Sequence, residues 1–182
     1  MRSPRLIFYV YPLKAGFSLF LAVWGFHGAR DYSKFWLVHG FDLIIHEAGH
    51  VIFRILGEFM MFLGGTLMQL LVPIAITAYF WYHRQRYAST VTAFWVGINL
   101  LDVAIYMKDA RIQALPLLGG EAVTHDWFYL FGRLGWLSMD QRIGNFVYFW
   151  GCVLGAIAVG TGFYFAISVN KPPKAPRSRL DV

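Results

Sequence analysis

The residues best suited to chemistry stand together as His-Glu-Ala-Gly-His, from His46 to His50. Two histidines four residues apart project from one face of a helix, one turn apart, so both imidazoles can bind the same metal ion. Zinc takes imidazole nitrogen and a third protein ligand, and it leaves one position for water. Glu47 directly follows the first histidine and is placed to act as a general base toward that water. The pattern predicts a metal site that performs hydrolysis.

The motif is specific because its residue types are costly where they stand. An Asp, Lys or Arg at the centre of a membrane helix costs roughly 2.5–3.5 kcal/mol. The motif lies in an otherwise apolar stretch, residues 35–56, which enters a membrane only if its polar side chains face away from lipid. Two plainer interpretations stay open. One is a polar seam of hydrogen bonds between helices, and the other is a metal that is structural rather than catalytic.

The polar residues of this stretch share one face of the expected helix. At about 100° per residue they fall within an arc of about 140°, and apolar residues cover the remainder. The polar set comprises His39, Asp42, His46, Glu47, His50 and Arg54. We therefore expect a helix with one polar face, which contacts water or binds a metal, and one apolar face.

Two of these residues are expected to lie near the ligand imidazoles without binding the metal themselves. Asp42 precedes His46 by one helical turn, a spacing that suits a hydrogen bond to the imidazole and would fix its tautomer. His39 lies about one turn further back on the same face. The alternative is that His39 and Asp42 line a path for water.

A catalytic zinc site needs a third protein ligand, and depth in the membrane favours Asp102. If segments 35–56 and 88–107 run in the same direction, residues equally far from their starts lie at equal depth. At 1.5 Å per residue, Asp102 lies roughly 21 Å deep, level with His46 and His50 at roughly 17 and 23 Å.

The alternative third ligand is His125. Imidazole suits zinc, and the adjacent carboxylate of Asp126 would support the ring from outside the ligand set. For this arrangement the long connection over residues 108–143 must fold back into the helix bundle.

The whole chain is far more apolar than a soluble protein. Hydrophobic residues make up 58% and charged residues 14% of its 182 residues, against roughly 45–50% and 25% in soluble domains. Its mean hydropathy is +0.51. This composition excludes a disordered chain, a nucleic-acid-binding module and a cytosolic enzyme. The single cysteine, Cys152, excludes a disulfide framework and a cysteine-rich zinc site.

Five segments meet or approach the length of about 20 apolar residues that a membrane span needs. They are residues 6–28, 35–56, 59–82, 88–107 and 144–169. The first carries Pro12 and Lys14, so it crosses the membrane, lies at its surface, or does some of each. We predict an all-α polytopic helix bundle, with one membrane domain over residues 1–170. Its location is an integral membrane one, the cytoplasmic membrane if the protein is bacterial, with lipid as its surroundings.

Two further features bear on partners. Residues 171–182 hold four basic residues and three prolines, which predicts a disordered tail near anionic headgroups. Small residues repeat along the last span and allow another helix to approach closely; they are Gly151, Gly155, Ala158 and Gly162. This stripe is either a seam within the chain or a contact in a homo- or hetero-oligomer.

With its His-Glu-x-x-His motif on an expected transmembrane helix, this small polytopic chain resembles the site-two protease class of intramembrane zinc metalloproteases. The resemblance covers a little under half of the chain. It implies that His46 and His50 bind zinc, that Glu47 is catalytic, and that an aspartate on a later membrane helix completes the site. That family's later motif has a proline after its asparagine and a glycine after its aspartate. Here the stretch reads Asn99-Leu-Leu-Asp102, without either.

The function expected from these features is zinc-dependent cleavage of peptide bonds at or within the bilayer, in a membrane-protein or peptide substrate. The main alternative is a non-catalytic subunit or scaffold of a larger membrane complex, with a structural metal or none. A metal or proton conduit would use the same polar stripe but needs ionisable groups across the whole bundle.

Overall fold

The computed structural model describes residues 7–118 and 123–170, and over these residues the protein is all-α apart from one short two-stranded sheet. The elements in chain order are β1 (Ile7–Val10), α1 (Pro12–Arg30), η1 (Tyr32–Phe35), α2 (Trp36–Phe53), η2 (Arg54–Leu56), α3 (Glu58–Tyr82), α4 (Arg86–Lys108), α5 (Asp126–Leu134), η4 (Leu137–Met139), α6 (Asp140–Phe165) and β2 (Ile167–Asn170). The all-α prediction is confirmed. The predicted disordered tail, residues 171–182, lies outside the described residues.

Three helical segments are long and apolar enough to cross a membrane. They are Glu58–Tyr82, Arg86–Lys108 and Leu137–Phe165. They match three of the five expected spans, so the count of about five is not confirmed. The first two expected segments form α1 and α2, which are shorter, with 19 and 18 residues.

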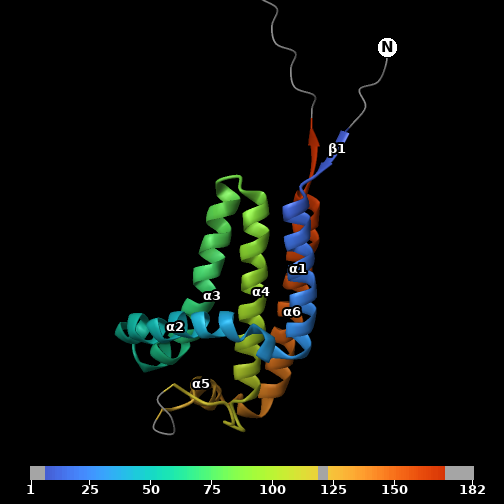
Figure 1. Cartoon of the computed structure of the whole chain (residues 1–182). Helices are drawn as coiled ribbons and strands as arrows, with labels where there is room; N and C mark the ends of the chain where they lie inside the picture. The colour runs from blue at the N-terminus through green and yellow to red at the C-terminus, as the bar shows by residue number, and fades with distance from the viewer. Residues whose placement is uncertain (1–6, 119–122, 171–182) are drawn as a thin grey trace, which may run out of the picture.

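The long helices form an upright bundle, and α2 lies across it (Figure 1). Helices α1, α4 and α6 run alongside one another, and α3 stands beside α4. The α3–α4 turn and the β1–β2 sheet lie at one end of the bundle, and α5 lies at the opposite end. Helix α2 runs across this axis, near the α5 end.

The crossing direction of α2 overturns the assumption behind the depth estimate for the third ligand. That estimate required α2 and α4 to run side by side in the same direction, but α2 crosses α4 instead (Figure 1). Residues along α2 therefore lie at nearly one level of the bundle. Their distance from the start of the helix does not report depth.

The turn from α1 into α2 is fixed by aromatic packing around Phe35. This side chain is 1% exposed, and it meets Trp24 and Tyr32 edge-on, with ring centroids 5.0 and 5.5 Å away. Gly28 lies directly against the ring, where a Cβ atom would overlap with it. Dense packing of this kind tolerates little rearrangement, so it sets the direction in which α2 leaves α1.

The small-residue stripe of α6 packs within the chain. A Cβ atom added to Gly151 would lie 2.8 Å from Leu101 of α4, and one added to Gly162 would lie 2.9 Å from Ser18 of α1. Ala158 is 4% exposed. Of the two interpretations of the stripe, the structure therefore shows the internal seam.

The close approach of α4 and α6 makes a prediction for Gly97. A Cβ atom at Gly97 would lie 3.1 Å from both the Gly151 oxygen and the Gly155 nitrogen, and backbone atoms of a packed helix cannot easily move aside. We expect Gly97→Ala to lower the free energy of unfolding by about 1–3 kcal/mol, the usual effect of overpacking. Thermal unfolding in detergent measures this. The matched control is Gly160→Ala on α6, where a Cβ meets nothing within 4 Å and no loss is expected.

Candidate metal centre

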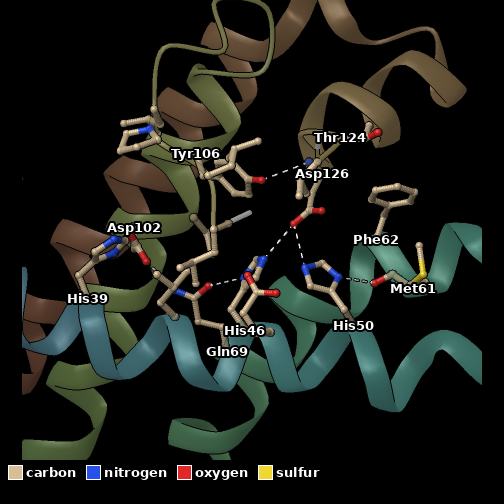
Figure 2. Close-up of a pocket in the computed structure, with 18 residues that line it drawn as sticks. His39, His46, His50, Met61, Phe62, Gln69, Asp102, Tyr106, Thr124 and Asp126 are labelled. Carbon is tan, nitrogen blue, oxygen red and sulfur yellow. Dashed lines mark hydrogen bonds and ion pairs between the residues drawn. The ribbon is translucent and has the colours of Figure 1, made fainter. Parts of the chain in front are cut away.

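Two imidazoles of α2 and one carboxylate of α5 converge on a single point (Figure 2). The Nε2 atoms of His46 and His50 lie 2.9 and 3.3 Å from the same oxygen, Oδ2 of Asp126. One ligand atom from each residue lies within 4.8 Å of the other two. Among the described residues, this is the group of three or more His, Cys, Asp or Glu side chains that could hold a metal ion.

Hydrogen bonds behind the two rings direct both Nε2 atoms toward Asp126. The Nδ1 atom of His46 lies 3.0 Å from Oε1 of Gln69, and that of His50 lies 2.8 Å from the Met61 carbonyl oxygen. A carbonyl oxygen only accepts, so each Nδ1 carries the proton. With its proton on Nδ1, each ring directs Nε2 toward a carboxylate oxygen. A positive charge, either a proton or a metal ion, must lie between them.

The donor set fits a catalytic zinc site. Zinc sites of that class hold three protein ligands drawn from imidazole nitrogen and carboxylate oxygen. Bonds of about 2.0–2.2 Å in tetrahedral geometry separate two ligand atoms by roughly 3.3 Å. The N–O distances of 2.9 and 3.3 Å are near that value, and all three ligand atoms lie within 4.8 Å of one another.

The start of α5 places Asp126. The backbone N–H of Asp126 donates to the Tyr106 hydroxyl at 3.2 Å, which ties the first turn of α5 to α4. Burial alone would raise the pKa of the Asp126 carboxyl, but where a proton is the positive charge between the groups, the hydrogen bonds that His46 and His50 then donate outweigh burial and hold this pKa below its ordinary value. The carboxylate is therefore charged at neutral pH and suited to a cation.

His125, the alternative third ligand, serves as the N-cap of α5. Its Nδ1 accepts the Phe128 N–H at 3.3 Å, and its Nε2 lies 3.3 Å from Oδ2 of Asp109. The ring is 1% exposed, and it is not part of the converging group. The connection does fold back as this alternative required, but it brings Asp126, expected only as a supporting residue, to the two histidines.

Asp102, the expected third ligand, is not part of the converging group and reaches it only through the side chain of Gln69. Its Oδ2 accepts from Nε2 of Gln69 at 2.7 Å, and its Oδ1 lies 3.1 Å from Nδ1 of His39. Because Gln69 also accepts from His46, the Asp102 carboxylate orients the Gln69 amide, and the amide orients the His46 ring. Asp102 and His39 thus lie behind the candidate ligands.

Asp42 contacts a different partner from the one the spacing suggested. Its side chain is 0% exposed, and its Oδ1 accepts from the indole Nε1 of Trp95 at 2.8 Å. The structure places it between α2 and α4, with no hydrogen bond to His46 among the described residues.

A cavity of about 440 Å³ opens beside the converging group. Glu47 lines it together with the three candidate ligands, and Glu47 is exposed. Leu43 of α2, Phe62 of α3 and residues 115–118 of the α4–α5 connection supply apolar walls. The general base expected from the motif therefore borders a space that can receive a substrate.

Three glycines, Gly49 of α2 and Gly64 and Gly65 of α3, let the two helices approach each other at the site. A Cβ atom at Gly65 would overlap with the His46 ring, and one at Gly49 would overlap with the backbone of Gly64. Side chains at these positions would separate the helices. The glycines thus allow Gln69 and Met61 of α3 to reach the backs of the two histidine rings.

Gln69 is the residue behind the ligands that sequence reasoning missed. It interrupts the apolar run of α3, and a polar side chain within a span generally turns toward the bundle interior. That signal was available in the sequence. The Met61 carbonyl carried no such signal, since a backbone oxygen is present at every residue.

The contact between Gln69 and His46 makes a testable prediction. We expect Gln69→Leu to weaken zinc affinity by about 10–100-fold, the usual effect of losing a hydrogen bond to a ligand imidazole. Competition with a chromophoric chelator measures this, and the ligand-field spectrum of the cobalt-substituted protein reports any change in geometry. Gln69→Glu restores an acceptor for His46 and should recover part of the affinity. Unchanged affinity in Gln69→Leu would contradict this role.

Comparison of the chain with protein-family models, with curated proteins and with solved structures finds no match.

Proposed function

We propose that the protein is an integral membrane metallopeptidase that uses zinc to hydrolyse peptide bonds at or within the bilayer. The single observation that carries this proposal is the convergence of His46 and His50 on Asp126 beside a cavity that Glu47 also lines. The three apolar helical segments support the membrane location. The resemblance to the site-two protease class implies the same roles, with His46 and His50 binding zinc and Glu47 catalytic.

The chain's own residues have separable tasks in this reaction. His46, His50 and Asp126 would hold zinc, which when bound polarises a substrate carbonyl and makes a neighbouring water more acidic. Glu47 accepts the proton of the attacking water and then delivers it to the leaving nitrogen. Gln69 keeps the His46 ring in the tautomer with its Nε2 lone pair toward the cavity.

The shape of the cavity suits a peptide of apolar sequence. Its walls carry leucine and phenylalanine side chains, and its polar groups gather at the candidate ligands and at the His39–Asp102 pair. Apolar walls with a few polar groups are typical of substrate sites. A membrane-protein segment or a hydrophobic peptide is the substrate class we propose.

The experiment that tests this function is metal removal and restoration in proteoliposomes. Purified protein is incubated with a library of quenched fluorescent peptides of apolar sequence, treated with a chelator, and then resupplied with zinc. We expect cleavage that the chelator abolishes and zinc restores, and no cleavage by the His46→Ala, His50→Ala double variant. Tight zinc binding with no cleavage of any peptide would instead favour a structural metal in a non-catalytic subunit.

A further inference from the structure

Helix α2 has an apolar face that no part of the described chain covers. Leu37, Ile44 and Val51 are 68%, 69% and 74% exposed. The stripe continues into η2, where Ile55 is 88% exposed. Single exposed apolar residues are ordinary, but a continuous stripe along a helix marks a surface that something apolar covers.

The apolar stripe lies opposite the histidines. At 100° per residue, Leu37 and Ile44 fall within about 20° of one another, roughly 150° away from the mean direction of His46 and His50. The latter two rings point into the site. The helix is therefore sharply divided into a chemical face and an apolar face.

The direction of each face is set by the bundle. Figure 2 shows the two histidine rings rising from α2 toward Asp126 at the start of α5, and Figure 1 shows α5 at the end of the bundle, beyond α2. The chemical face of α2 thus looks toward the near end of the bundle. The apolar stripe on its far side looks toward the middle of the bundle's length.

The length of α4 gives the level of α2. From Arg86 to Lys108 the helix rises about 33 Å, close to the roughly 30 Å of bilayer hydrocarbon, with a cation at each end. Asp102 and Tyr106, which border the site, lie about 9 and 3 Å from the level of Lys108. Amphipathic helices that lie in a membrane surface are buried about 5–10 Å into the headgroup and acyl boundary.

We propose that α2 lies in the plane of the membrane within one leaflet, with lipid acyl chains covering its apolar face and its histidine face turned to the water side. This inference rests on the membrane location in the proposed function but not on the peptidase activity. Its consequence for that activity is the position of the cut. The metal centre stands just inside one membrane surface, so the peptide bonds within reach are those near that surface rather than at the bilayer centre.

The test is the depth of spin labels along α2 in proteoliposomes. Single cysteines replace Leu37, Ile44 and Ile55 in turn, in a Cys152→Ala background that folds as judged by a monodisperse profile. The ratio of oxygen to nickel-chelate accessibility gives the depth of each label. Ile157→Cys, at an exposed position of α6, is the lipid control, and Arg133→Cys, at an exposed position of α5, is the water control.

An in-plane α2 gives three labels that are oxygen-accessible and at one depth, agreeing within about one helix radius, ~5 Å. A spanning α2 would spread them over about 27 Å and would overturn the proposal. Labels open to the nickel chelate would show that water covers the face, and spin–spin broadening between molecules would show that a second copy does; either result also overturns it. If the Ile157 label too were water-accessible, the membrane location in the proposed function would fail with it.

Discussion

Replacing Asp126 with asparagine is expected to weaken zinc affinity by more than roughly 100-fold. That factor is the upper end of the usual loss when a metal-binding side chain loses its hydrogen-bond partner. The substitution keeps the size of the side chain but removes the negative charge that both imidazoles face at 2.9 and 3.3 Å. A neutral amide is a poorer donor to zinc and leaves two nitrogen ligands alone. Chelator competition measures the affinity, and elemental analysis measures the bound metal.

The matched control is Asp102→Asn. Asp102 reaches His46 only through Gln69, so its loss of charge should weaken zinc affinity less than the Asp126 substitution does. His125→Gln, which alters the N-cap of α5 without touching the converging group, should retain stoichiometric zinc. If Asp102→Asn lost the metal and Asp126→Asn kept it, the assignment of the third ligand would be wrong.

Replacing Glu47 with glutamine is expected to reduce peptide cleavage by about 10²–10⁴-fold, the usual contribution of a general base. Glutamine has nearly the same shape but cannot accept the proton of the attacking water. Because Glu47 is not one of the three converging residues, bound zinc should stay at the wild-type level. Cleavage rates and metal content are measured on the same preparations.

Glu58→Gln provides the matched control for charge. Glu58 begins α3, accepts a hydrogen bond from the Tyr129 hydroxyl at 2.9 Å, and does not line the cavity. Its substitution should leave cleavage near the wild-type rate. Wild-type cleavage by the Glu47→Gln protein would exclude the general-base role and favour the scaffold alternative.

Local patterns in the sequence were sufficient to predict the long helices and the histidine pair on one helix face. Residues 59–82 and 144–169 are apolar over a bilayer length, and helical spacing alone places His46 one turn from His50. Both features depend only on neighbours in the chain. The structure shows the first segment in α3 at nearly the expected limits and the histidine pair within α2. Helix α6, Asp140–Phe165, begins and ends before the limits expected for the second segment, whose last residues lie in β2.

The third converging residue depended on information that no local pattern holds. The choice of Asp102 assumed that α2 runs parallel to α4, whereas the axis of α2 is set by the packing of Phe35 against Gly28 and Trp24. The path of the α4–α5 connection then decided between His125 and Asp126. Adjacent residues point to different sides of a helix start, so His125 caps α5 while Asp126 reaches the two histidines.

The separation of α2 and Asp126 in the sequence has a consequence for the stability of the fold. An ion shared by His50 and Asp126 would cross-link two residues that are far apart in the sequence. A cross-link that closes a long loop restricts the unfolded chain more than one that closes a short loop. Binding to the folded form alone adds about 2.7 kcal/mol when free zinc stands at 100 times its dissociation constant. Loading with zinc should therefore slow protease nicking of the connection between α4 and α5.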